Sequence, residues 1–405
     1  MSKSKSPKLS TQFSLSPEEK LMEVGAESGQ MFIGIPKDEN YSDGRVALTP
    51  LSSAILVNRG HRIIMESNAG VGSNFYDNDY SEAGVEICDD GKKVFEADII
   101  LKVTPPKQKD LDLLKPGQTL ISPLQLPTMS GAMLQQLKAK KITCIAFEYL
   151  ADDTGVFPIV RAMSEIAGSS SILIASELLS KTNNGKGILL GGVTGVPPAK
   201  VVILGGGVVG EYASRAAMGL GAEVKVFDNS ISKLMRMQNN LESRVFTSTI
   251  DPKILSKEME TADVMVGAIH SKSGRSPIIV TESMVAKMKK GSVIIDISID
   301  QGGLFETSDI TTLEDPTFIA YDVVHYCVPN IAARVARTSS KAVSNILSNY
   351  LLSMHENGGL DNFLQQFVNC RQGIYLYKGA LTNKHLSEQF DIKFTSIDLL
   401  LASVF

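Results

Sequence analysis

Long apolar runs, paired cysteines and a strong net charge are missing from this chain of 405 residues. No apolar stretch approaches the roughly 20 residues that are needed to cross a bilayer, which argues against direct membrane insertion. The formal charge of −4 and the scattered basic residues give no long-range attraction for nucleic acid or anionic lipid. We therefore expect neither a nucleic-acid partner nor insertion into a membrane.

The four cysteines lie far apart in the sequence, with no C-x-x-C pair and no nearby histidine grouping. This spacing does not fit a zinc-site motif, so no metal site is predicted. Isolated cysteines are typical of reduced thiols in a protein core, which favours a cytoplasmic location. Residues 1–30 lack the apolar segment of a secretion signal, so we expect an N-terminal extension with one short helix that Ser16 caps.

Short β-branched runs alternate with helical patterns along the chain, which predicts an α/β fold. The first series of predicted strands covers 31–36, 62–67, 97–103, 118–124 and 142–147. The second series covers 201–205, 223–228, 263–269, 292–298 and 318–324. Predicted helices at 164–181 and 339–356 lie between and after the two series. Because the strands are apolar almost throughout, they suit parallel sheets that are covered on both faces.

The segment AKVVILGGGVVGEYASRAAMGLGAEVKVFD, residues 199–228, contains a glycine turn between a predicted strand and a predicted helix. Gly205 permits the sharp bend, Gly207 lets the backbone approach a pyrophosphate, and Gly210 lets the helix and strand pack closely. The helix N-terminus offers N–H groups to phosphates. Asp228 suits the ribose hydroxyls and repels a 2′-phosphate, so the motif predicts NAD as the cofactor in preference to NADP.

Two observations leave alternatives open at this motif. Lys233 and Arg236 follow Asp228 closely, and either side chain can reach a phosphate. A glycine turn without any ligand is also a possible interpretation, although the complete strand–turn–helix–strand–acid order disfavours it.

Several longer motifs accompany the glycine turn, namely GIPKDENYSDGRVALTP, MSEIAG, GKGILLGGVTGVPPAKVVILGGGVVG, IDQGG and VVHYCVPN. Through them the chain resembles the alanine dehydrogenase and pyridine-nucleotide transhydrogenase family from Met31 to about Asn349. The IDQGGLFET and VVHYCVPN segments are more similar to the alanine dehydrogenase branch. The resemblance also implies a homo-oligomer, which is hexameric in alanine dehydrogenases and dimeric in transhydrogenase subunits.

The resemblance implies two doubly wound Rossmann-like domains with parallel sheets, separated by a cleft. The substrate domain is expected to combine residues 31–160 with residues 337–405, and the NAD-binding domain to cover 161–336. Such a cleft agrees with the rule that ligands bind at domain interfaces and at the carboxyl ends of parallel strands.

The resemblance also implies roles for particular residues. Arg45 falls where the family anchors the substrate carboxylate, and Asp300 falls where an aspartate lies beside the nicotinamide ribose and the substrate. Without the motifs, Arg45 reads as a loop arginine and Asp300 as a turn residue. His325 belongs to a motif on the cofactor side and is expected to be a packed structural histidine. The expected cofactor-binding residues are Ser164, Gly205, Gly207, Val208, Val209, Gly210, Asp228, Lys233, Ile269, Asp300, Val328 and Asn330.

Two positions depart from the family pattern. Alanine dehydrogenases carry a catalytic histidine in a YLHLA-like segment, whereas this chain reads SPLQLP and has Gln125 there. The family's second lysine in a KVKEP-like stretch, which holds the substrate, is replaced by Thr104 in KVTPP. Glutamine can orient water, but it does not titrate and is no general base. Glu148 or Lys102 is an alternative base, and each also has a structural explanation.

These observations leave three functions to compare. The first is an NAD-dependent dehydrogenase of L-alanine or a related small amino acid. It is supported by the cofactor motif, Arg45 and Asp300, and its substrate pocket is altered by Gln125 and Thr104. A soluble NAD(H)-binding subunit of a proton-translocating transhydrogenase needs no acid–base residue, but the IDQGG and VVHY segments speak against it. A non-catalytic NAD-binding protein is the third, since the loss of the base permits it.

Overall fold

The computed structural model describes residues 29–38, 43–124, 129–183, 185–241, 243–271 and 274–402. The helix expected near Ser16 lies outside these described residues. Within the described ranges, no helix combines the length and the apolar character that a membrane span requires.

The first sheet contains strands from both ends of the chain. Its strands are β1 (Phe32–Ile35), β2 (Arg62–Glu66), β3 (Glu86–Cys88), β4 (Ile99–Leu101), β5 (Thr119–Ser122), β6 (Thr143–Ala146), β14 (Ile374–Tyr377) and β15 (Ala380–Leu381). They follow the order β15-β14-β6-β5-β4-β1-β2-β3. Pairing is parallel from β3 to β6, whereas β14 is antiparallel to both of its neighbours. The helices in these stretches are α1 (Pro50–Asn58), α2 (Asp77–Glu82), α3 (Gly91–Val94), α4 (Gln108–Leu113), α5 (Gly131–Ala139), α12 (Leu360–Gln366), α13 (Lys384–Phe390) and α14 (Ile397–Ala402).

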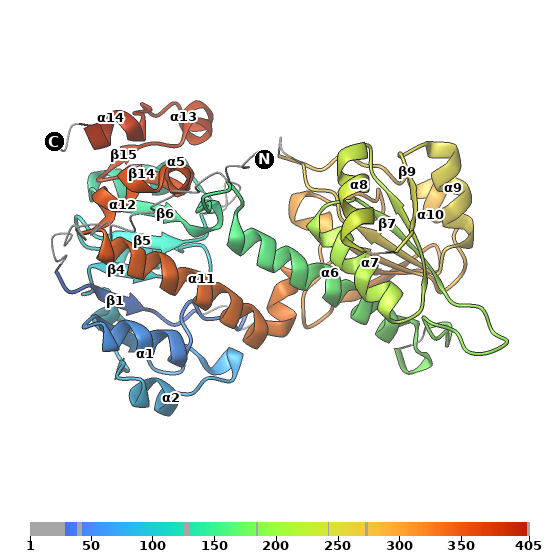
Figure 1. The fold of residues 1–405 in the computed structure, drawn as a ribbon, viewed down its shortest axis with the longest axis horizontal. Coiled ribbons are helices and arrows are strands. Elements are labelled where there is room, and N and C mark those ends of the chain that lie inside the picture. The colour runs from blue at the N-terminus through green and yellow to red at the C-terminus, as the bar shows by residue number, and fades with distance from the viewer. Residues whose placement is uncertain are drawn as a thin grey trace, which may run out of the picture.

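The second sheet is built from the middle of the chain. Its strands are β7 (Lys200–Leu204), β8 (Glu223–Phe227), β9 (Phe246–Ser248), β10 (Val264–Gly267), β11 (Val293–Asp296), β12 (Thr317–Ala320) and β13 (Val323–Tyr326). They follow the order β12-β13-β11-β10-β7-β8-β9, and only β12 runs antiparallel. The helices here are α7 (Val208–Gly219), α8 (Ile231–Asn240), α9 (Pro252–Thr261) and α10 (Glu282–Val285). Figure 1 shows the two sheets in separate halves, with α6 (Pro158–Leu179) and α11 (Ala336–Glu356) running between them.

Both sheets are doubly wound, so the α/β class and the parallel sheets predicted from the sequence are confirmed. In the first sheet β1 lies beside β4, and in the second β7 lies beside β10, with later strands added outward on both sides. At such a switch point the loops after neighbouring strands diverge and leave a crevice at the carboxyl ends, where ligands of open α/β sheets bind. The fold therefore offers one ligand crevice in each half.

The prediction of one strand at 318–324 is wrong, because this segment holds the antiparallel pair of β12 and β13. The chain reverses at Tyr321 and Asp322, whose φ angles are 54° and 60°. Two consecutive residues with positive φ form the tight turn that joins a two-residue hairpin. The apolar pattern runs straight through this reversal, which hides the turn in the sequence. The short strands β3, β9, β14 and β15 were also missed.

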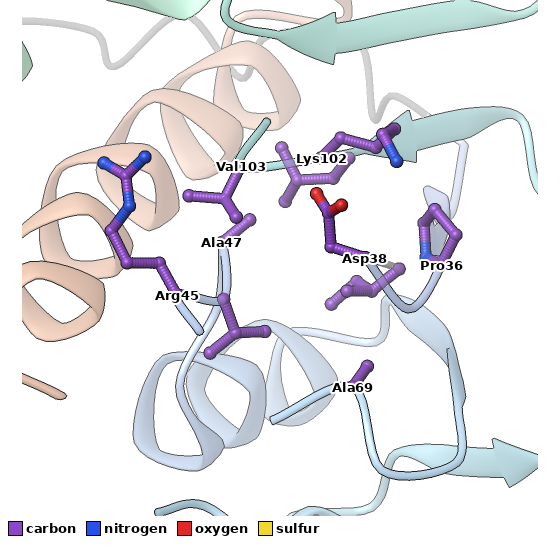
Figure 2. Close-up of a pocket in the computed structure, with 10 residues that line it drawn as sticks. Pro36, Asp38, Arg45, Ala47, Ala69, Lys102 and Val103 are labelled. Atoms are coloured by element: carbon purple, nitrogen blue, oxygen red, sulfur yellow. The ribbon is translucent and has the colours of Figure 1, made fainter. Parts of the chain in front are cut away.

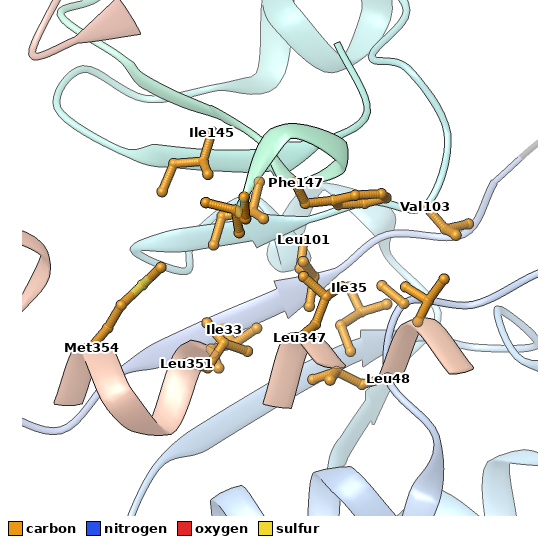
Figure 3. Packing of buried hydrophobic residues seen from close by; sticks show 14 of the residues in the cluster. Ile33, Ile35, Leu48, Leu101, Val103, Ile145, Phe147, Leu347, Leu351 and Met354 are labelled. Carbon is orange, nitrogen blue, oxygen red and sulfur yellow. The ribbon is translucent and has the colours of Figure 1, made fainter. Parts of the chain in front are cut away.

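The long helix α11, from the C-terminal part of the chain, completes the core of the first half. Figure 3 shows Leu347 and Leu351 of this helix packed beside Ile33 and Leu101 of the sheet. All four side chains are at most 1% exposed. Full burial of one such side chain stabilises the fold by roughly 1.5–3 kcal/mol. This packing ties the C-terminal part of the chain to strands formed from its N-terminal part.

Helix α6 also packs closely on α7. A Cβ at Gly168 would lie 2.3 Å from the carbonyl oxygen of Val209, so only glycine allows the two backbones to come this near. The contact fixes the start of α7 against α6. Because α7 follows the glycine turn, this packing also fixes the position of the turn.

Candidate active site

The carboxyl ends of β1 and β4 form a pocket at the switch point of the first sheet. Pro36 and Asp38, which follow β1, line it together with Lys102 and Val103, which follow β4, and with Arg45. A cavity of about 180 Å³ lies beside this pocket and also has Asp38 and Arg45 in its wall. Figure 2 shows Asp38 between Arg45 and Lys102, whose side chains point away from one another. This is the strand-end crevice that the topology predicts.

Arg45, the expected anchor for the substrate carboxylate, is paired with Asp43. Its Nε lies 2.5 Å from Oδ1 of Asp43 and its Nη2 lies 2.8 Å from Oδ2, which is a bidentate ion pair. The two side chains are only 11% and 8% exposed. The remaining Nη1 lies 3.7 Å from the sulfur of Met163 on α6. The pairing therefore fixes the plane of the guanidinium.

Asp43 also contacts the second half of the molecule. The side-chain amide of Asn330 donates a hydrogen bond of 2.7 Å to Oδ2 of Asp43. The backbone N–H of Asn330 donates a second hydrogen bond, of 3.1 Å, to the carboxylate of Asp300. Asp300 lies in the short 3-10 helix η5 (Ile297–Gln301) after β11 and reaches solvent. Partial burial of its carboxyl group raises the pKa of Asp300, while the Asn330 N–H and the charge of Arg45 oppose this. Hydrogen bonds thus join the expected substrate anchor to the expected nicotinamide side.

The two family lysine positions have internal partners. Thr104 is buried, and its hydroxyl donates to the carboxylate of Asp38. The Lys102 ammonium lies 3.1 Å from Oδ2 of Asp110, and the two side chains are 3% and 4% exposed. Thr104 therefore brings no positive charge to the pocket, and the charge of Lys102 is already balanced.

The glycine turn forms the switch point of the second sheet. Gly205 has φ +119°, and a Cβ there would lie 2.4 Å from the carbonyl oxygen of Ala268. A Cβ at Gly210 would lie 1.8 Å from the carbonyl oxygen of Gly205. A Cβ at Gly207 would meet nothing within 4 Å. The fold itself therefore requires glycine at the first and third positions, whereas at the second position the glycine leaves open space.

Gly207 is the N-cap of α7 and has no side chain to cap the helix. The helices α8 and α9, by contrast, are capped by the side chains of Ser230 and Asp251. Val208 and Val209 form the first turn of α7 and are half-buried. A helix N-terminus of this kind has N–H groups and a positive dipole end that suit a phosphate.

Asp228 follows β8 and is buried against the glycine turn. Its carboxylate accepts hydrogen bonds of 2.7 Å from the N–H groups of Gly206 and Ser230. The ammonium of Lys233 lies 3.7 Å from Oδ2 of Asp228, and Arg236 donates to the carbonyl of Gly206. The backbone hydrogen bonds fix the Asp228 carboxylate at the edge of the turn, where the motif predicts a ribose.

The remaining expected cofactor positions are distributed around the second sheet. Ile269 follows β10 and would contact a Cβ at Gly205 at 3.1 Å, so it lies at the glycine turn. Val328 follows β13 and is buried, and Ser164 is half-buried on α6, one turn before Gly168. The structure thus brings Ile269 to the turn and Ser164 onto the helix that packs against α7, whereas β11 and β10 separate β13, which Val328 follows, from β7.

Gln125 lies outside the described residues. The chain on its N-terminal side is held by Glu148, because the Leu124 N–H donates a hydrogen bond of 2.8 Å to Oε1 of that side chain. The second oxygen of Glu148 is buried and has no hydrogen-bond partner in the described part of the chain. Burial raises the pKa of Glu148 to about 7.

His325 is packed as expected. Its Nε2 lies 2.8 Å from the hydroxyl of Thr307, its Nδ1 lies 3.0 Å from the carbonyl of Val323, and its ring stacks on Phe318. Burial lowers the pKa of His325, so the neutral ring is favoured. The described residues contain no group of three histidine, cysteine or acidic side chains arranged to hold a metal ion.

The roles of Asp43 and Asp38 were not predicted from the sequence. Asp43 orients Arg45, and Asp38 accepts the hydrogen bond of Thr104. The one sequence signal for Asp43 is the spacing in SDGR, where an acidic residue stands two positions before the arginine. No comparable signal exists for Asp38, since its partner Thr104 lies 66 positions further along the chain.

Two doubly wound sheets, one with a glycine turn at its switch point and one with a pocket that Arg45 lines, define a two-domain α/β protein of the Rossmann-like class. Models of the two domains named alanine dehydrogenase/PNT match residues 34–167 and 171–384. The chain therefore belongs to the alanine dehydrogenase/PNT family, which confirms the resemblance seen in its motifs.

Individual relatives agree with this assignment. The chain is 40% identical over 369 residues to alanine dehydrogenase 2 of Staphylococcus aureus (strain USA300), covering 91% of this chain and 99% of that protein. A solved structure of an L-alanine dehydrogenase superposes with a TM-score of 0.84 at 34% identity, covering 90% of this chain and 100% of the other. A transhydrogenase structure from Sinorhizobium meliloti gives 0.75 at 21% identity, covering 87% and 99%, and shares the fold.

Proposed function

We propose that this protein is an NAD-dependent amino-acid dehydrogenase. It deaminates L-alanine or a related small amino acid to the 2-oxo acid and ammonium. The main support is the hydrogen-bonded series from Arg45 through Asp43 and Asn330 to Asp300. This series connects the pocket that Arg45 lines to the half of the molecule that carries the glycine turn.

We assign the substrate domain to residues 31–160 and 337–405 and the NAD-binding domain to residues 161–336. Residues 1–30 are an N-terminal extension of the substrate domain. The assignment is supported by the C-terminal strands β14 and β15, which pair in the same sheet as β1 to β6. The two matching domain models meet near residue 170, which is close to the proposed domain boundary at residues 160 and 161.

The residues around the glycine turn fit a dinucleotide. In our proposal the N–H groups at Gly207, Val208 and Val209 hold the pyrophosphate, since the open space at Gly207 admits a ligand close to the backbone. Asp228 accepts hydrogen bonds from the adenosine ribose, and its negative charge favours NAD over NADP. Bound NAD supplies a hydride acceptor, and the other cofactor-lining residues are Ser164, Lys233, Ile269, Asp300, Val328 and Asn330.

The substrate side relies on Arg45. Its guanidinium binds the α-carboxylate, which directs the substrate Cα–H bond towards the half that carries Asp300. Loss of a hydride from Cα leaves an iminium carbon, to which water adds before ammonium departs. Asp300 lies on the nicotinamide side and contacts the polar groups of the substrate as they change charge.

Activation of the attacking water is the reaction step for which this protein lacks the usual base. Gln125 cannot take up the proton, and Thr104 contributes a hydroxyl where relatives have a cation, so we expect slow turnover of alanine or a different amino acid as substrate. Of the two alternative bases, Glu148 is the better candidate because its pKa of about 7 matches the working pH. Lys102 is instead neutralised by Asp110.

On the family resemblance we also propose a cytoplasmic homo-oligomer, either a hexamer or a dimer. Free cysteines at all four positions agree with a reducing compartment. The pairing of the Thr104 hydroxyl with Asp38 is also compatible with a second candidate function. A soluble NAD(H)-binding transhydrogenase subunit passes hydride to a partner and needs no cation at that position.

A steady-state assay of NADH formation with a panel of L-amino acids tests the proposal. Turnover with one or more small amino acids, with NAD preferred over NADP, supports it. Flat traces with the whole panel reject it. In that case NADH binding by calorimetry without turnover indicates a non-catalytic binding protein, and hydride transfer in the presence of an NADP-binding membrane subunit indicates a transhydrogenase.

A further inference from the structure

Asp43 accepts four hydrogen bonds from two residues, Arg45 and Asn330. Its Oδ1 accepts hydrogen bonds from Nε and the backbone N–H of Arg45, at 2.5 and 3.4 Å. Its Oδ2 accepts from Nη2 of Arg45 at 2.8 Å and from Nδ2 of Asn330 at 2.7 Å. A residue that is only 7% exposed therefore joins two side chains from opposite halves of the molecule.

The geometry leaves Arg45 able to bind a second carboxylate. A guanidinium carries five N–H donors, and Asp43 occupies the edge formed by Nε and Nη2. The edge formed by Nη1 and Nη2 is separate. Nη1 contacts only the thioether sulfur of Met163 within the described residues, at 3.7 Å, and a thioether is a weak acceptor. Asp43 and a substrate carboxylate can therefore bind to Arg45 at the same time.

Asn330 connects this pair to the nicotinamide side. Its φ of 54° is a left-handed conformation that asparagine tolerates better than most residues. In this conformation its side chain reaches Asp43 while its backbone N–H donates to Asp300 at 3.1 Å. One residue thus contacts both the carboxylate that orients Arg45 and the aspartate expected beside the nicotinamide.

We propose that Asp43 is a positioning residue that orients the guanidinium of Arg45 and links it to Asn330. The substrate carboxylate then binds at a fixed distance from the hydride acceptor. The inference rests on the proposed dehydrogenase function. Asp43 itself touches no substrate atom, and it acts by removing the rotational freedom of a long side chain whose free edge must face the ligand.

Asp43→Asn is the direct test. The amide keeps the size of the side chain, but its NH2 group cannot accept a hydrogen bond, so one of the two parallel bonds to Arg45 is lost. We expect the KM for the amino acid to rise at least about tenfold while kcat and the KM for NAD change by less than about threefold, the signature of lost ground-state binding. Asp43→Glu restores the carboxylate and should recover part of the affinity.

Two further variants complete the experiment. Asn330→Gly keeps the left-handed backbone and the N–H bond to Asp300 but removes the amide that binds Asp43. It should raise the amino-acid KM several-fold, and it tests the link if Asp43→Asn yields little folded protein. Asp361→Asn is the matched control, because Asp361 pairs with Tyr377 and Lys378 on the surface of the first half. This control should leave both KM values unchanged.

The outcomes separate this inference from the proposed function. A wild-type enzyme that forms no NADH with any amino acid, and whose bound NADH shows no fluorescence change on titration with pyruvate, overturns both. Wild-type turnover with an unchanged KM in Asp43→Asn and Asn330→Gly overturns only the positioning role. A lowered KM in Asp43→Asn also overturns it, because Asp43 would then compete with the substrate for Arg45.

Discussion

Replacement of Glu148 by glutamine is expected to change how the stability of the protein depends on pH. The carboxyl group lies at the end of β6, with one oxygen bound to the Leu124 N–H and the other buried without a hydrogen-bond partner in the described part of the chain. Burial disfavours the charged form and raises the pKa of Glu148 from 4.5 to about 7. Between these values the folded protein keeps a proton that the unfolded chain has released.

The sign and the size of the effect follow from this difference. A raised pKa stabilises the fold below pH 4.5 relative to neutral pH, and the stability falls as the pH rises to about 7. Each pKa unit corresponds to about 1.4 kcal/mol, so the total loss is about 3 kcal/mol. Glutamine carries no charge at any pH and still accepts the hydrogen bond from Leu124. The variant should therefore lack this loss and exceed the wild type in stability above pH 7.

Urea unfolding at pH 5 and pH 8, followed by circular dichroism, measures the prediction. Tyrosine fluorescence is a second probe, since the chain has no tryptophan. Glu86→Gln is the matched control because the side chain of Glu86 is 51% exposed and pairs with Arg62 on the surface. Wild type and Glu148→Gln with parallel stability curves between these pH values would refute the reasoning. A fall in turnover with little change in stability would instead identify Glu148 as the base.

Two further predictions concern residues of the proposed cofactor site and of the pocket. Gly210→Ala should destabilise the fold by roughly 1–3 kcal/mol or more, because its Cβ would overlap the carbonyl oxygen of Gly205, whereas Gly207→Ala should fold normally and lose NADH affinity in calorimetry. Equal stability of the two variants would contradict this. Lys102→Met should destabilise the protein by roughly 3–5 kcal/mol in urea unfolding by leaving a buried charge on Asp110, and adding Asp110→Asn should recover part of the loss.

Much of the fold was predictable because it is encoded locally. Apolar runs of five to seven residues mark most of the central strands, and their alternation with helical patterns is enough to indicate parallel α/β sheets. The hairpin at Tyr321 and Asp322 was not predictable in this way, since its turn contains neither glycine nor asparagine. Short strands such as β9 and β15 carry too few residues to show a period.

In the candidate site, too, the features encoded within one segment were predictable, whereas the contacts between distant segments were not. The glycine turn and Asp228 lie within one segment of sequence, so their spacing already describes their geometry. The contacts of Asp43 and Asp38 join residues that are 287 and 66 positions apart. No local pattern records such pairs, because they arise only when two strand ends or two halves of the molecule come together.

The three glycines of the turn show why a motif and its structure answer different questions. Gly205, Gly207 and Gly210 are the same residue type, and the dinucleotide-binding motif assigns a different role to each of them. The structure separates these roles, because a Cβ at Gly205 or Gly210 would collide with backbone atoms while a Cβ at Gly207 would enter open space. The open space at Gly207 lets a ligand come close to the backbone N–H groups at the start of α7. The case for a bound dinucleotide therefore rests more on Gly207, where nothing in the protein demands glycine, than on the two positions where the fold demands it.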